Sequence, residues 1–160
     1  PWFLAGLRPG DVALNCVPAG GLTTGGWGPG EGLRIAGATA FHAGGSLSTD
    51  AKIDLMIRIG GMNFIYASTN YLHTLSEALN KRGIDPKTAF PGLRTLFIAA
   101  EAYPVEWAQK IENIWGCKLQ EGYGSTQCAG FAGSTCEEGT VTVDGQRGKL
   151  HLLVLAKWAR

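Results

Sequence analysis

Hydrophobic residues recur along the chain in short blocks that are separated by stretches with helical spacing. The blocks at residues 11–17, 38–43, 63–68, 93–100 and 117–122 are apolar and rich in β-branched or aromatic side chains. Short continuous runs of this kind are typical of strands buried on both faces of a sheet. We therefore expect five buried strands.

Helices are predicted between these strands by apolar residues spaced three and four apart. One helix is capped within residues 48–50 and ends at Ile59, another covers residues 71–82, and a third begins at Pro104 and ends before Gly116. Strand and helix alternate with short connections, which favours parallel strands joined by right-handed crossovers. The fold class expected is α/β, a mostly parallel, doubly wound sheet with flanking helices.

Glycine dominates residues 19–32, which we interpret as a turn followed by a short helix at residues 33–37. This loop could cradle an anion or admit a flat substrate. It lacks the lysine of GxxxxGK[ST] and the spacing of GxGxxG, which counts against kinases, GTPases and NAD enzymes. A GxSxG elbow is absent from the whole sequence, which counts against an α/β-hydrolase.

The pattern changes after Gly139, where apolar residues alternate on both sides of the turn signal Asp144-Gly145. We expect an antiparallel hairpin there. The chain is accordingly divided into an α/β part at residues 1–133 and, at residues 134–160, a hairpin that starts a small antiparallel β subdomain.

Composition narrows the function classes. Of the 160 residues 45% are hydrophobic, only 17% are charged, and the net charge is +1, so no electrostatic footprint for nucleic acid or acidic membranes is present. No apolar run reaches the roughly 18 residues of a membrane span. The four cysteines are too scattered for a disulfide framework, which favours a reducing cytoplasm. A zinc site that combines Cys128 and Cys136 with distant ligands stays open.

The most informative motif is EGYGSTQ at residues 121–127, directly after the last predicted parallel strand. Ligands of open parallel sheets bind beyond the carboxyl ends of the strands. Tyr123 offers a flat face for a base, and Ser125 or Thr126 can donate to a phosphate oxygen. A plain glycine-rich turn is the alternative interpretation of the same residues.

Six motifs in order resemble the phenylacetate–CoA ligase branch of the adenylate-forming enzymes. They are RPGDV (8–12), TTGGWG (23–28), GATAFHAGG (37–45), STNYL (68–72), AAEAYP (99–104) and EGYGSTQ (121–127). The resemblance implies a large-domain segment of a ligase that adenylates an aryl carboxylic acid with ATP and Mg²⁺ and transfers the acyl group to coenzyme A. It also implies that the catalytic-lysine domain lies outside this chain, that this segment alone is inactive, and that a homodimer is an open alternative.

The resemblance assigns roles position by position. Around the nucleotide it places Ala100, Glu101, Ala102, Glu121, Gly122, Tyr123, Gly124 and Thr126. In the aryl pocket it places Thr23, Gly25, Gly26 and Tyr71, and at Mg²⁺ it places Gln127. Tyr123 would stack on the adenine, and Thr126 would hydrogen-bond the α-phosphate as the catalytic residue. Pre-aimed donors of this kind stabilise a negatively charged five-coordinate phosphorus.

Two positions depart from the family. Gln127 stands where the family has a Mg²⁺-binding glutamate, so metal affinity should fall. Thr23 replaces an aromatic residue, which suggests a roomier or more polar acid pocket. Transfer of the acyl group to a carrier-protein thiol or an amine remains an alternative to coenzyme A, and a non-catalytic nucleotide-binding relic remains a third.

Overall fold

The structure is a computed structural model that describes residues 2–20, 24–128, 130–142 and 144–152. Its sheet has the strand order β2-β1-β3-β4-β5-β6-β7 within this part of the chain. The strands are β1 Val12–Pro18, β2 Thr39–Gly44, β3 Met62–Ser68, β4 Thr95–Ala99, β5 Lys118–Ser125, β6 Gly130–Ser134 and β7 His151–Leu152. β1 to β5 are parallel, whereas β6 and β7 are antiparallel to their neighbours. The predicted mostly parallel α/β sheet is confirmed.

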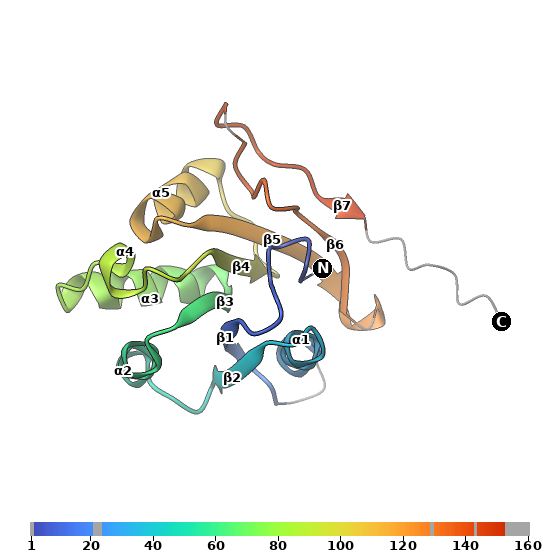
Figure 1. Ribbon diagram of the computed structural model, residues 1–160. Helices are drawn as coiled ribbons and strands as arrows, with labels where there is room; N and C mark the ends of the chain where they lie inside the picture. The colour runs from blue at the N-terminus through green and yellow to red at the C-terminus, as the bar shows by residue number, and fades with distance from the viewer. Residues whose placement is uncertain (1, 21–23, 129, 143, 153–160) are drawn as a thin grey trace.

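Helices cover both faces of the sheet. They are α1 Thr24–Ile35, α2 Thr49–Ile59, α3 Thr69–Lys81, α4 Pro86–Ala89 and α5 Val105–Trp115, with a short 3-10 turn η1 at Thr126–Cys128. Figure 1 shows α2 to α5 on one side of the sheet and α1 with the N-terminal segment on the other. We call these sides the α5 face and the α1 face. No helix in the described ranges is long and apolar enough to cross a membrane.

Each face has its own apolar core. On the α5 face the buried side chains of β3, β4 and β5 include Ile65, Ile98 and Leu119, which pack on α2, α3 and α5. On the α1 face the core is aromatic, with rings contributed by Trp2, Phe64, Tyr66, Phe97 and Phe131. Successive residues of a strand point to opposite faces, so each central strand feeds both cores.

Helix α1 corrects the sequence-based expectation of a turn at residues 19–32. The helix begins at Thr24, inside the glycine-rich stretch, and only its end near residue 35 was expected. A Cβ on Gly26 would lie 1.8 Å from the Pro18 carbonyl oxygen, and one on Gly30 would lie 2.1 Å from the His42 ring. These glycines therefore let a helix approach the sheet backbone and do not mark irregular chain.

The segment after β6 also differs from the expected hairpin. A turn does form at Asp144-Gly145, where the Gly145 N–H donates to the Thr142 carbonyl and Val141 bridges Arg147. After the turn, β7 pairs with β6 and extends the same sheet. The boundary of a separate β subdomain remains a prediction.

The glycine packing yields a stability prediction. Replacing Gly26 by alanine should lower the free energy of unfolding by about 1–3 kcal/mol, because overpacking against β1 outweighs the better helix propensity of alanine. Urea unfolding followed by circular dichroism measures the change. The matched control is Gly28→Ala on the same helix, where the nearest atom to a new Cβ is 3.6 Å away. That variant should gain about 0.5–1 kcal/mol. Equal stabilisation of both variants would contradict the packing argument.

Candidate functional site

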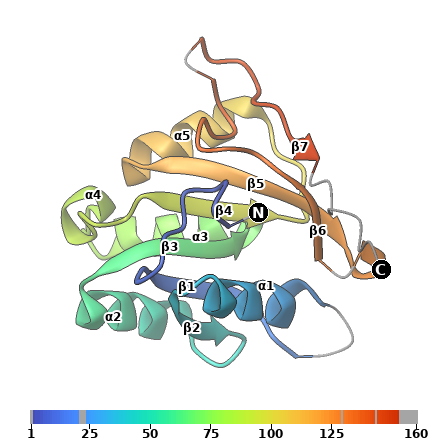
Figure 2. The ribbon, with the colours of Figure 1, turned by 45° about the vertical axis from the view of Figure 1, so that its right-hand side comes forward.

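The carboxyl ends of β3, β4 and β5 meet at one edge of the sheet (Figure 2). Strand order 2-1-3-4-5 is a doubly wound arrangement in which ligands bind beyond these ends. In the register of β4 and β5, Ala99 pairs with Gly122, so the chain beyond Ala99 continues beside Tyr123. Glu101 and Tyr123 therefore lie at the same end of the sheet, as the sequence predicts.

A cavity of about 300 Å³ opens at this edge on the α1 face. Its walls come from α1, β3, β4, β5, η1 and β6. The lining residues are Thr24, Gly25, Pro29, Tyr66, Ala99, Ala100, Gly124, Ser125, Thr126, Gly130 and Phe131. Four residues to which the resemblance assigns roles are thus brought together, namely Gly25, Ala100, Gly124 and Thr126, and Ser125, the alternative phosphate donor, lies beside them. Among the described lining residues there is no charged side chain.

Tyr66 forms one wall of the cavity and fixes the start of α1. Proline at position 29 has no N–H, so the Gly25 carbonyl four residues earlier loses its helical partner. The Tyr66 hydroxyl donates to that carbonyl at 2.8 Å. Burial raises the pKa of Tyr66 to about 12. Sequence reasoning missed Tyr66 because its partner lies 41 residues away in the chain.

Ala100 occupies an unusual backbone conformation at the cavity mouth. It is the non-glycine residue with positive φ, at 80°, in the described part of the chain. Such backbone costs on the order of 1–2 kcal/mol for an L-residue. Strain of this kind concentrates at functional sites, where the surrounding structure enforces it. The conformation turns the chain sharply after β4, between the cavity and the start of α5.

The glycines of the EGYGSTQ motif have a packing role. A Cβ on Gly122 would lie 2.7 Å from the Phe131 ring, and one on Gly124 would lie 2.2 Å from the Gly130 carbonyl oxygen. Both positions therefore require glycine because β6 packs on them. Tyr123 between them projects to the other face, where its side chain is 64% exposed. An exposed ring at the end of a strand is available for stacking.

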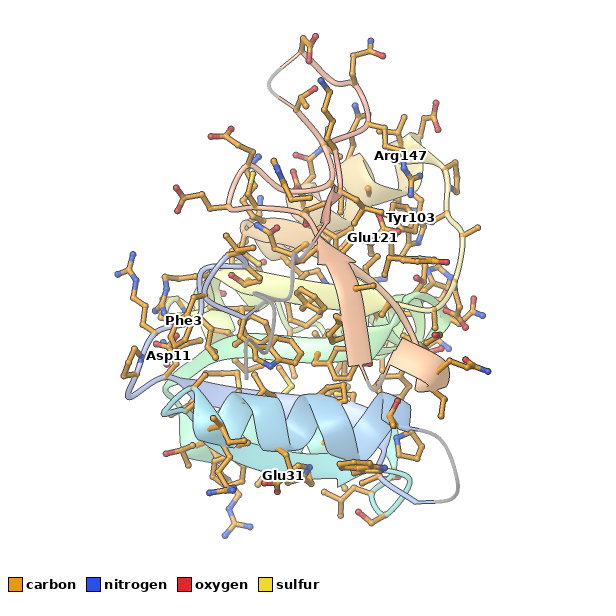
Figure 3. The ribbon with its side chains drawn as sticks, turned by 90° about the vertical axis from the view of Figure 1, so that its right-hand side faces the viewer. Phe3, Asp11, Glu31, Tyr103, Glu121 and Arg147 are labelled. Atoms are coloured by element: carbon orange, nitrogen blue, oxygen red, sulfur yellow. The ribbon has the colours of Figure 1, made fainter. Side chains whose placement is uncertain are left out.

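Glu121 lies on the α5 face in a tight cluster with Tyr103 and Arg147, as Figure 3 shows. The Tyr103 hydroxyl donates to Glu121 Oε2 at 2.6 Å, and Arg147 Nη2 lies 3.2 Å from the same oxygen. The Arg147 guanidinium also stacks 4.7 Å above the Tyr103 ring. Burial and the neighbouring Glu121 raise the pKa of Tyr103 well above its usual value, so its hydroxyl remains a donor at neutral pH. Arg147 was not among the predicted site residues.

Glu101 binds a helix terminus. Its carboxylate accepts from the Asn70 backbone N–H at 2.7 Å and from Asn70 Nδ2 at 3.0 Å. A negative charge is favourable there because the first N–H groups of α3 point outward. The structure thus places Glu101 at the start of α3. Ala102, one residue further, lines a separate shallow hollow.

The other residues predicted for the aryl pocket are Tyr71, Gly26 and Thr23. Tyr71 packs under Lys52, whose Nζ lies 4.6 Å from the ring centroid, and the Tyr71 hydroxyl contacts Thr49. It is not part of the cavity lining. Gly26 is buried against β1, and Thr23 lies outside the described residues.

Gln127 is exposed within η1, next to Thr126 at the cavity mouth. No group of three or more His, Cys, Asp or Glu side chains that could hold a metal occurs in the described ranges. A carboxamide oxygen can ligate Mg²⁺ without charge, and the ion usually takes its other ligands from substrate phosphates and water. The position therefore fits an ion held mainly by a nucleotide.

A larger hollow of about 620 Å³ lies between α3 and α5. Its lining includes His73, Glu77, Trp107 and Lys110, and it contains none of the predicted site residues. Because it lies along the helices and no strand ends in it, we assign the candidate site to the smaller cavity at the strand ends.

No protein-family model and no curated protein sequence matches the chain. Solved structures do match. An open conformation of 2-hydroxyisobutyryl-CoA ligase in complex with 2-HIB-AMP and CoA has 22% identity and a TM-score of 0.73 over 84% of this chain and 31% of its own. A benzoate CoA ligase from Burkholderia xenovorans LB400 has 19% identity and a TM-score of 0.71, covering 92% and 29%. Apo MatB from Rhodopseudomonas palustris has 18% identity and a TM-score of 0.69, covering 95% and 28%.

These likenesses establish the fold. The chain has the architecture of one segment of these ligases and spans about 30% of their length. The phenylacetate branch of the resemblance and the roles of individual residues stay predictions.

Removal of the Tyr66 hydroxyl should give a pH-dependent change in stability. Near pH 8, Tyr66→Phe should unfold about 1 kcal/mol more easily, because the Gly25 carbonyl loses its donor. The folded pKa of about 12 exceeds the ordinary value of 10, so the protonated hydroxyl stabilises wild type below pH 10. That contribution is lost as pH rises toward 12, and the order of the two proteins should reverse.

Urea unfolding between pH 8 and pH 11.5 measures this crossing. Tyr123→Phe removes a hydroxyl from an exposed ring and serves as the matched control. Parallel stability curves for wild type and Tyr66→Phe would rule out a buried, carbonyl-bound hydroxyl.

Proposed function

We propose that the chain is the nucleotide- and acyl-binding segment of an AMP-forming acid–CoA ligase that acts on an aryl carboxylic acid. The observation that carries the proposal is the cavity at the ends of β3, β4 and β5, which joins Gly25 of α1 to Thr126 of η1. The solved CoA ligases of the same fold support it, since one holds both 2-HIB-AMP and CoA.

The adenosine binds on the α5 side of the edge. Tyr123 supplies an exposed ring for stacking, and the backbone from Ala100 to Ala102 borders the other side of the base. Stacking of a base on an aromatic ring contributes about 1–3 kcal/mol. Glu121 projects from the same face of β5 as Tyr123, because the two residues are two apart, and it lies at the edge of the base.

The acyl group enters the cavity on the α1 face. The walls there are glycines, Pro29, Tyr66 and Phe131, which suit a flat apolar ring. A volume of about 300 Å³ is at the small end for ligand pockets, so a single ring with a short acid arm is the expected size. The α-phosphate lies between the adenosine on the α5 side and the acyl group in the cavity, within reach of Thr126.

The reaction has two steps. The carboxylate oxygen attacks the α-phosphorus of ATP, and the bond to pyrophosphate breaks. The thiolate of coenzyme A then attacks the acyl carbon, and AMP leaves. Thr126 stabilises the charge that develops on the α-phosphate in the first step by donating its hydroxyl. Mg²⁺, when bound to the nucleotide, neutralises phosphate charge, and Gln127 offers it one neutral oxygen.

ATP–pyrophosphate exchange with a panel of aryl acids tests the function. In the full-length protein, Thr126→Val keeps the side-chain volume but removes the donor, and it should lower the exchange rate about 10²- to 10³-fold. The control is Thr88→Val in α4, which lies outside the cavity. If the wild-type protein exchanges pyrophosphate with none of the acids, the proposed ligase activity is refuted.

Gln127→Glu tests the metal assignment separately. A carboxylate binds Mg²⁺ more strongly than a carboxamide, so half-maximal exchange should require less Mg²⁺ in the variant. A titration of exchange rate against free Mg²⁺ measures the shift. An unchanged titration would remove residue 127 from the metal site. Absence of exchange in both wild type and Gln127→Glu would favour a relic that binds nucleotide without catalysis.

A further inference from the structure

Two side chains converge on one carboxylate at the α5 edge of the site. Glu121 Oε2 accepts from the Tyr103 hydroxyl at 2.6 Å and from Arg147 Nη2 at 3.2 Å. Arg147 is itself held, since its Nη1 donates to the Tyr103 carbonyl at 3.1 Å and its guanidinium covers the Tyr103 ring. These residues come from the connection between β4 and α5, from β5 and from the segment that follows the turn at Asp144-Gly145, so the cluster joins three separate segments (Figure 3).

The two oxygens of Glu121 are used unequally. Oε2 has two close donors, whereas Oε1 has only a long contact of 3.4 Å with Arg147 Nη2 among the bonds of the described residues. A carboxylate oxygen can accept two hydrogen bonds. The Glu121 side chain is 17% exposed, so a small planar group at the edge of the sheet can reach it. The cluster therefore fixes a carboxylate while leaving acceptor capacity on one oxygen.

We propose that Tyr103 and Arg147 are positioning residues that hold Glu121 so that its free acceptor selects a 6-amino purine over a 6-oxo purine. The proposal rests on the proposed function, which places the base beside Tyr123 and Glu121. It adds two residues that lie outside EGYGSTQ and that were not among the predicted site residues.

The chemistry of selection follows from donors and acceptors. Adenine presents an amino group at position 6, which donates to Glu121 Oε1. Hypoxanthine presents a carbonyl oxygen at the same position, so two acceptors face each other. A freely rotating carboxylate would turn away and tolerate either base. Tyr103 and Arg147 prevent that rotation, and the mismatch then leaves a desolvated acceptor without a partner.

Binding of ATP and ITP to the full-length protein tests the inference, because the two bases differ only at position 6 and in the proton that hypoxanthine carries on N1. Wild type should bind ATP at least about tenfold more tightly than ITP. In Arg147→Met, which keeps a long apolar stem over Tyr103, the ratio should fall roughly threefold to tenfold. Tyr103→Phe should lower it similarly, and Arg147→Lys should restore part of it. Glu121→Gln should bring the ratio close to one, since a carboxamide can also donate.

The matched control is Arg34→Met, which removes a guanidinium from an exposed pair with Glu31 on α1 (Figure 3) and should leave the ratio unchanged. Thermal unfolding of each variant shows whether the protein is still folded. A purely structural role of Tyr103 or Arg147 would weaken ATP and ITP binding equally and leave their ratio unchanged. ATP binding with a wild-type ratio in Arg147→Met and Tyr103→Phe would overturn the inference and leave the proposed function standing. Wild type that binds neither nucleotide would overturn both.

Discussion

Helix α1 lies against the sheet at a distance that only glycine permits, and the candidate site depends on that contact. Gly26 leaves no room for a side chain against the Pro18 carbonyl, and Gly30 leaves none against His42. Pro29 frees the Gly25 carbonyl, which Tyr66 of β3 then binds. Asn15 Nδ2 of β1 also donates to the Gly26 carbonyl, at 2.8 Å. Close packing and these two hydrogen bonds thus hold the start of the helix beside the strand ends, and the helix cannot rise from the sheet without breaking them.

Alternation along β5 divides the strand-end site into two halves. Glu121 and Tyr123 project to the α5 face, whereas Gly122 and Gly124 face α1 and leave space for the Phe131 ring and the β6 backbone. A ligand with a polar heterocycle at one end and an apolar group at the other can therefore lie across the edge of the sheet. Its middle would be near Thr126, at the cavity mouth. Under the proposed function, the alternation of side chains along β5 would separate recognition of the base from recognition of the acid.

Much of this arrangement was predictable from periodicity alone. The five parallel strands and α2, α3 and α5 have apolar patterns that tertiary contacts merely complete. The position of EGYGSTQ after the last of these strands was wrong, because β5 continues through Ser125, where its final residues pair with β6. Helix α1 was missed because its glycines act through close packing on β1, which local propensity does not record. Tyr66 and Arg147 were missed because each acts on a residue more than 20 positions away. Tyr71, predicted for the pocket, is instead held under Lys52.

Charge determines how an acid can enter the cavity. Its described lining has no cationic side chain to pair with a carboxylate, while Glu101, Glu121 and Arg147 lie on the other side of the edge. Burying an unpaired carboxylate in an apolar cavity would cost several kcal/mol, whereas burying an apolar ring is favourable. In the proposed ligase the acid would therefore enter with its ring first and keep its carboxylate at the mouth. That orientation would bring the nucleophilic oxygen to η1, next to the hydroxyl of Thr126, where a phosphate bound across the edge would be attacked.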